Sequence, residues 1–94
     1  MNLNRTITLS PDVISQEVSG ETVLLDLDTE NYFGLNEVGT RTWQLIKSTG
    51  DLQAVYDTLL AEYEVSEARL KQDLDTLLTE IERLGLITLG EKDA

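Results

Sequence analysis

The sequence predicts an α+β domain in which a three-stranded antiparallel sheet is followed by three helices. Two periodicities support this prediction. Hydrophobic residues alternate with polar ones as far as Leu35, and from Asn36 onward they recur every three or four positions. With 94 residues, of which 40% are hydrophobic, the chain is long enough for one compact core. We therefore expect a single domain over residues 1–94, with an ordered core from about residue 9 to about residue 89.

Three extended segments account for the predicted sheet. The first runs from Val13 to Val18 and the second from Thr22 to Asp28, with turn-forming residues at 19–21 between them. A second short turn at Thr29-Glu30 leads into a third strand from about Asn31 to Leu35. Because both connections are short, the second strand lies in the middle and the third lies at an edge. No later segment obviously pairs with the third strand, so its edge is expected to be open.

The alternation also predicts which side chains face the core. In the second strand, three apolar residues alternate with a mostly acidic set, so we expect the first set to be buried and the second to be solvated: Val23, Leu25 and Leu27 against Leu24, Asp26 and Asp28. By the same parity Phe33 is expected to face the core and Tyr32 the solvent.

Each predicted helix has a recognisable beginning or end. Polar residues that cap helix N-termini precede the three helical segments: Asn36, Asp51 and Ser66. Gly50 ends the first helix, and Gly85 follows the third helix, which runs to about Leu84. The third helix carries a narrow apolar stripe made of Leu70, Leu74, Leu77, Leu78 and Ile81.

The remaining segments are short. Residues 6–9 are expected to form an extended arm, residues 86–89 an apolar tail that packs back, and residues 91–94 a frayed end. Neither the sheet nor the helices can bury an apolar face alone, so the helices must cover the sheet. The result is a winged-helix-like arrangement.

Composition excludes several classes of function. The chain has no cysteine and no histidine, so it lacks the commonest nucleophile, general base and transition-metal ligands. Its formal net charge of -11, with only 7 basic residues, disfavours binding to nucleic acid or to anionic lipid. No apolar run is long enough to span a membrane, and the N-terminus does not resemble a secretory signal. We expect a cytoplasmic protein without catalytic residues, metal or cofactor.

Two local patterns could suggest a small ligand. Asp26, Asp28 and Glu30 lie close enough to hold a hard cation, but the calcium-loop pattern is absent, and a solvated acidic face is the better interpretation. Gly34 and Gly39 flank a strand-to-helix junction without the spacing of a phosphate-binding loop. Neither pattern predicts a site.

The third strand and the third helix together suggest a groove. Asp73 lies at one margin of the helix stripe, and that margin is expected to lie beside the open strand edge. Strand and helix would then form the two walls of an apolar groove. An added peptide strand could bind there through its main chain, with selectivity from side-chain pockets.

The same residues resemble a known family. Leu24-Leu25-Asp26, the run from Thr29 to Gly39 and Trp43-Gln44-Leu45-Ile46 are similar to the signature of PqqD-like proteins. These are the recognition elements for precursor peptides of ribosomally made and post-translationally modified products (RiPPs). The similarity continues to the Leu84-Gly85-Leu86-Ile87 ending and covers about residues 9–89. One departure is Glu30-Asn31, where many members carry a glycine in the turn.

The resemblance implies a function for the groove. The leader segment of a precursor peptide would add to the third strand and lie between it and the third helix. Carried onto this chain, the residues that bind the leader peptide are Asn31, Tyr32, Phe33, Gly34 and Leu35 on the strand and Leu70, Asp73, Leu74 and Leu77 on the helix. The chain would be a non-catalytic peptide chaperone that presents its cargo to a separate modifying enzyme. Split lasso-peptide systems, with a leader peptidase and a macrolactam synthetase, are the nearest match.

Three alternatives stay open. The partner could be a radical SAM enzyme, as in pyrroloquinoline quinone assembly. From another class, the helical half permits a winged-helix DNA-binding regulator, although the basic residues are not clustered as DNA contacts require. The open strand could also pair with a second copy, giving a structural dimer with a six-stranded sheet.

Overall fold

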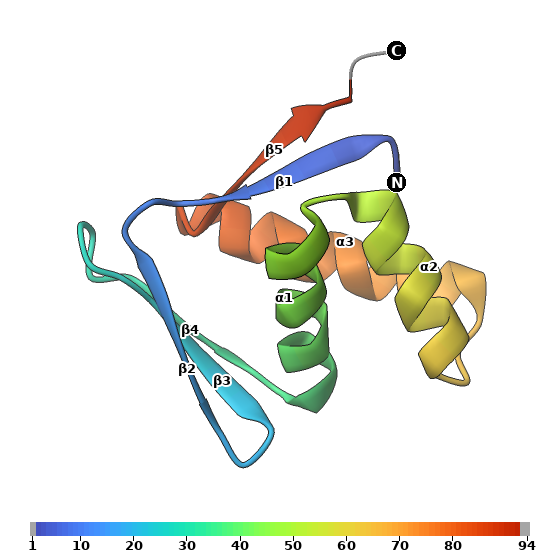
Figure 1. Cartoon of the computed structure of the whole chain (residues 1–94), viewed down its shortest axis with the longest axis horizontal. Helices are drawn as coiled ribbons and strands as arrows, with labels where there is room; N and C mark the ends of the chain where they lie inside the picture. Colours follow the sequence, from blue (N-terminus) through green and yellow to red (C-terminus); the bar gives the residue numbers. More distant parts are fainter. Residues whose placement is uncertain (1, 93–94) are drawn as a thin grey trace.

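The computed structural model describes residues 2–92. Along the chain the elements are β1 (Arg5–Leu9), β2 (Val13–Val18), β3 (Glu21–Asp26), β4 (Tyr32–Leu35), α1 (Glu37–Thr49), α2 (Leu52–Glu62), α3 (Glu67–Arg83) and β5 (Ile87–Glu91). The α+β class, the three-stranded antiparallel sheet and the three helices are as predicted. Figure 1 shows the β2-β3-β4 meander on one side of the molecule and the three helices on the other.

A second sheet was not predicted. β1 and β5 pair antiparallel, from Arg5 opposite Glu91 to Leu9 opposite Ile87. The expected extended arm and apolar tail are therefore two strands of one ribbon, and Glu91 belongs to a strand, whereas the sequence suggested a frayed end. The part of the frayed-end prediction that concerns residues 93–94 lies outside the described residues. Two strands this far apart in the sequence leave no local signal of their pairing, because they meet only when the rest of the chain has packed.

The meander has β3 in the middle, as predicted, but its buried face is the opposite of the predicted one. Leu24 is fully buried and Asp26 is 3% exposed, whereas Val23 is 51% and Leu27 60% exposed. The Asp26 carboxylate accepts hydrogen bonds from the backbone N–H groups of Asp28 (2.9 Å) and Thr29 (3.3 Å) in the following turn. A polar residue can therefore face inward here, because turn donors satisfy it. The prediction that Asp26 lies on a solvated acidic face was wrong for this reason.

The turns of the meander use left-handed backbone. Ser19 (φ 54°) and Gly20 (φ 81°) form the two-residue connection between β2 and β3. Glu30, before β4, has a φ of 64°. This is the turn in which many PqqD-like sequences carry a glycine, the residue that adopts such a φ at least cost.

The helix ends are as predicted. The side chains of Asn36, Asp51 and Ser66 accept hydrogen bonds from the N–H groups of Gly39, Gln53 and Arg69, at 2.8, 3.0 and 3.2 Å. Gly50 and Gly85 follow α1 and α3 with φ of 62° and 78°. These local bonds fix where each helix begins and ends.

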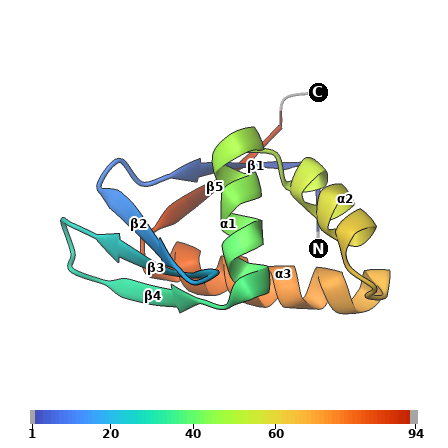
Figure 2. The same cartoon turned by 60° about the horizontal axis from the view of Figure 1, so that its bottom comes forward.

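The helices and the inner face of the meander share one hydrophobic core. Its members include Leu24 and Leu35 from the sheet, Trp43 and Ile46 from α1, and Ile81 from α3. Ile7 of β1 also belongs to it. In Figure 2, β4 runs directly into the lower end of α1, and α3 lies at the same level and passes behind that end of α1. This arrangement places β4 next to α3 and so determines the geometry of the site.

Candidate functional site

The edge of β4 is open. β4 pairs with β3, from Thr22 opposite Leu35 to Leu25 opposite Tyr32, and within residues 2–92 it has no second neighbour. The Asp26 N–H donates to the Asn31 carbonyl. In an antiparallel ladder, residues alternately direct their backbone groups toward the neighbouring strand and away from it, so this bond determines which residues of β4 face β3. Phe33 and Leu35 therefore direct their backbone groups to β3, and Tyr32 and Gly34 direct theirs to the open edge. An additional strand would find these groups free.

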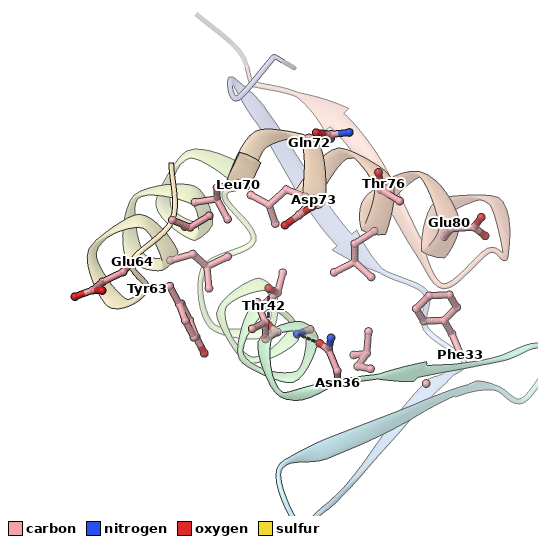
Figure 3. A pocket seen from close by; sticks show the side chains of 18 residues that line it. Phe33, Asn36, Thr42, Tyr63, Glu64, Leu70, Gln72, Asp73, Thr76 and Glu80 are labelled. Atoms are coloured by element: carbon pink, nitrogen blue, oxygen red, sulfur yellow. Dashed lines mark hydrogen bonds between the residues drawn. The ribbon is translucent and has the colours of Figure 1, made fainter. Parts of the chain in front are cut away.

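A cavity of about 760 Å³ separates this strand from α3. Phe33 and Leu35 line it from β4, and Leu74 and Leu77 line it from α3. Figure 3 shows Phe33 facing α3 across the cavity, and it shows the Asp73 side chain extending from the helix into the cavity. The cavity is thus an apolar groove with the open strand as one wall and α3 as the other.

The structure brings together seven of the nine residues that the sequence pointed to. Phe33, Gly34, Leu35, Leu70, Asp73, Leu74 and Leu77 all line the groove, whereas Asn31 and Tyr32 do not. The margin of α3 that carries Asp73 faces β4, and Leu78 lies buried on the other side of the helix stripe.

Asn31 positions the strand. Its side-chain Nδ2 donates a hydrogen bond to the backbone carbonyl of Leu84 at the end of α3, at 3.1 Å. Its own carbonyl accepts from the Asp26 N–H. Asn31 therefore ties the start of β4 both to β3 and to the C-terminus of α3.

Tyr32 belongs to a different surface. Its side chain is 73% exposed and lies on the outward face of the meander, in register with Leu25. Only its backbone is directed to the open edge.

The groove continues past the end of β4 into a pocket that sequence reasoning missed. Its walls come from the start of α1, the end of α2 and the loop before α3, through Val38, Thr42, Leu59, Tyr63 and Val65. Figure 3 shows Thr42 and Tyr63 on this side. One signal in the sequence was available, since Val38 is an apolar residue in a first helical turn. In the structure it is 43% exposed. Thr42, Leu59 and Tyr63 fit the apolar stripes of their helical segments, and Val65 lies in the loop before α3, so their exposure to a pocket depends on how the helices pack.

The charge of the groove rim is negative. Glu64, Asp73 and Glu80 line the groove, and none of its described lining residues is Lys or Arg. Asp73 pairs with Arg69 at 3.1 Å and Glu80 pairs with Arg83 at 2.6 Å, both on exposed surface where such pairs are weak. The rim therefore favours a ligand with basic side chains near α3.

A second cavity of about 410 Å³ lies between β2 and α1. Ser15, Glu17 and Lys47 contribute polar side chains to it, and Gln44 donates a hydrogen bond to Glu17 at 3.2 Å. It is smaller and more polar than the groove, so the outer edge of β2 lacks the apolar wall that α3 provides beside β4.

Other kinds of site find no support in the described part of the chain. No three His, Cys, Asp or Glu side chains of residues 2–92 are grouped to hold a metal ion. Within the same residues, no helix has the length and apolarity that crossing a bilayer requires.

Comparisons with known proteins agree with this geometry. The family model described as "Coenzyme PQQ synthesis protein D (PqqD)" matches residues 21–87. The solved structure "TbiB1 in Complex with the TbiA(beta) Leader Peptide" is 34% identical, with a TM-score of 0.80, over 85% of this chain and 93% of that one. "Lasso peptide synthetase B1 complexed with the leader peptide" is 24% identical, with a TM-score of 0.77, over 88% of this chain and 98% of that one, a likeness of fold. No curated protein matches the chain.

Proposed function

Because the chain belongs to the PqqD family, we propose that it binds the leader segment of a ribosomally synthesised precursor peptide and presents it to a separate modifying enzyme. The observation that carries the proposal is the open edge of β4 beside an apolar groove. The relative at 34% identity was solved with a leader peptide bound.

The leader would bind as a fourth strand of the meander. Tyr32 and Gly34 would supply the backbone hydrogen bonds, and alternate leader side chains would enter the groove between Phe33 and Leu77. The residues proposed to bind the leader are those that the sequence suggested. Asn31 would act indirectly, through the hydrogen bonds that position β4. The pocket beyond the end of β4 would accept one larger apolar side chain of the leader.

The proposed role is delivery rather than catalysis. With no histidine or cysteine, the groove offers no activated nucleophile or general base of the usual kinds. A bound leader raises the concentration of its attached core segment near an enzyme that also binds the complex. We propose a lasso-peptide leader peptidase or macrolactam synthetase as the enzyme, with a radical SAM enzyme as the alternative. The identity of the neighbouring enzyme gene distinguishes the two.

The alternative as a DNA-binding regulator is less well supported. The net charge of -11 repels phosphates, and Arg69 and Arg83 on α3 already pair with acidic neighbours. A gel shift with duplex DNA at low salt tests it directly, and tight binding would favour it over peptide binding.

The test of strand addition is Gly34→Pro. Proline at this position removes an N–H that is directed to the open edge, and it leaves the hydrogen bonds of Phe33 and Leu35 to β3 intact. We expect leader affinity to fall by about tenfold or more, the effect of one lost backbone hydrogen bond plus the bulk of the ring. A fluorescently labelled leader of the precursor encoded with this chain, titrated by anisotropy, measures the affinity.

Ser15→Pro is the matched control. Ser15 lies on the opposite edge strand, β2, and the same alternation directs its N–H away from β3. This variant should bind the leader as the native chain does. Equal affinities for all three proteins would contradict strand addition at β4. Backbone amide shifts confined to β2 and β3 on titration would contradict the groove.

A further inference from the structure

The outward face of the meander is unusually apolar for an exposed surface. Cross-strand register aligns Ile14, Leu25 and Tyr32 in one row, and Val23 lies in the next row beside Gly34. Six large hydrophobic residues are exposed within residues 2–92, and five of them belong to this side of the sheet, namely Ile14, Val18, Val23, Leu27 and Tyr32. We call this surface the outer face. In Figure 1 the three helices lie on the other side of the meander.

The two middle rows of the outer face carry no charged side chain, although 27% of the chain is charged. Gln16 is the polar side chain in the row of Val23 and Gly34, and Glu21 lies at the end of the hairpin opposite Val18. An antiparallel sheet with one solvated face ordinarily carries polar residues there. A contiguous apolar patch on a rigid sheet is typical of a surface that binds another protein.

The outer face is continuous with the proposed leader site, on which this inference rests. A leader strand paired with β4 would place every second side chain beside Tyr32 and Gly34, on this same side of the sheet. Gly34 leaves open space there, since a Cβ at that position would meet nothing within 4 Å. The leader would thus extend the outer face by one strand.

We propose that the outer face, extended by the bound leader, is the docking surface for the modifying enzyme. The fitting partner has an apolar docking patch with basic residues at its margin, to complement a chain of net charge -11. Because the enzyme would contact sheet and leader together, it would bind the loaded chain more tightly than the empty one. This provides a physical basis for delivering cargo and then releasing the empty carrier.

The same charge argues against a second copy as the occupant. Face-to-face pairing would bring two chains of charge -11 together, and their mutual repulsion opposes association at low ionic strength. A positively charged partner would be attracted by the same negative charge that repels a second copy.

The test is a triple variant, Ile14→Thr, Val18→Thr and Val23→Thr. All three positions are at least half exposed, and threonine keeps the β-branched shape that suits a strand, so the fold should persist. Circular dichroism and thermal unfolding check this. The matched comparison is Leu77→Ala, which alters the groove and leaves the outer face intact.

Three measurements separate the two sites: leader affinity by anisotropy, affinity of the leader-loaded chain for the purified enzyme encoded with the precursor, and the rate of precursor processing. For the triple variant we expect leader affinity within twofold of native, enzyme affinity at least tenfold weaker, and slower processing at saturating precursor. For Leu77→Ala we expect weaker leader binding, with processing restored by excess precursor.

The outcomes that overturn the proposal are distinct. Native enzyme affinity and processing by the triple variant, with leader binding intact, would show that the enzyme docks elsewhere. Sedimentation of the native chain as a dimer that the triple variant abolishes would assign the outer face to self-association. Failure of the native chain to bind the leader would instead remove the proposed function, and with it this inference.

Discussion

Asn31 shows how one side chain can organise a binding edge without facing the ligand. Its amide spans from the start of β4 to the carbonyl of Leu84, and its backbone closes the ladder to Asp26. The carbonyls at a helix C-terminus lack intrahelical partners, so a side-chain donor there satisfies an otherwise free group. The Asn31 hydrogen bond thus joins the start of β4 to the end of α3, in addition to the core that the two elements share.

Asn31→Ala should lower both stability and leader affinity. We expect the free energy of unfolding to fall by about 1 kcal/mol, the usual net worth of such a hydrogen bond, and leader affinity to fall severalfold as β4 loses its anchor. Urea denaturation and leader titration measure the two effects. Asn31→Asp keeps the size but cannot donate when ionised, so it should behave similarly. Native affinity in both variants would show that the hydrogen bond does not hold the edge in place.

At the scale of elements, α3 serves two surfaces at once. Leu78 and Ile81 are fully buried in the core, whereas Leu77 is half-buried and lines the groove. Adjacent positions on a helix differ by 100° around its axis, so consecutive leucines can face different neighbours. The periodicity identified the stripe, and the position of β4 decided which margin of the stripe stays accessible.

The pair Leu77→Ala and Leu78→Ala separates these two roles. Leu78→Ala creates a cavity in the core and should cost about 2–5 kcal/mol of stability. Leu77→Ala should cost less than about 1.5 kcal/mol and weaken leader binding by about tenfold, because it removes an apolar contact that a ligand would make. Thermal unfolding and anisotropy titration distinguish them. If Leu78→Ala remained folded and lost more leader affinity than Leu77→Ala, the assignment of the two margins would be reversed.

At the scale of the whole molecule, the first and last strands pair next to the start of α2. Asp51 caps α2 through the Gln53 N–H, bridges to Thr6 of β1, and pairs with Lys92 at 2.6 Å. The hydrogen bond from Lys92 is the main cause that lowers the pKa of Asp51 below its ordinary value, with the Gln53 N–H adding to it and desolvation opposing it. Asp51 thus connects three segments: its backbone bridges to β1, and its carboxylate joins the start of α2 to Lys92.

Stability should therefore fall in acid. A carboxyl group whose pKa is lowered in the folded state stabilises the fold above its ordinary pKa, and this contribution is lost as pH falls through and below about 4. Glu62, whose pKa is lowered chiefly by the hydrogen bond from Arg41, contributes in the same direction. Urea unfolding between about pH 3 and pH 7 measures the slope. Asp51→Asn should be less stable at neutral pH and show a shallower loss in acid, and an unchanged slope would contradict this role of Asp51.

The sequence by itself determined the features that depend on neighbours along the chain. The caps at Asn36, Asp51 and Ser66, the left-handed glycines after α1 and α3, the strand order of the meander and its open edge all follow from turn chemistry, capping and periodicity. Seven of the residues that line the groove followed as well, because they lie on that edge and on that stripe.

Only the tertiary structure decided the features that require distant segments to meet. Whether Leu24 or Val23 faces the core depends on turn donors that satisfy the buried Asp26 carboxylate. The pairing of β1 with β5 and the pocket beyond β4 arise when elements far apart in sequence pack together, and the outer face stays exposed because the helices cover the other side of the meander. Local periodicity records that a segment has two faces, and the free energy of packing selects which of them is buried.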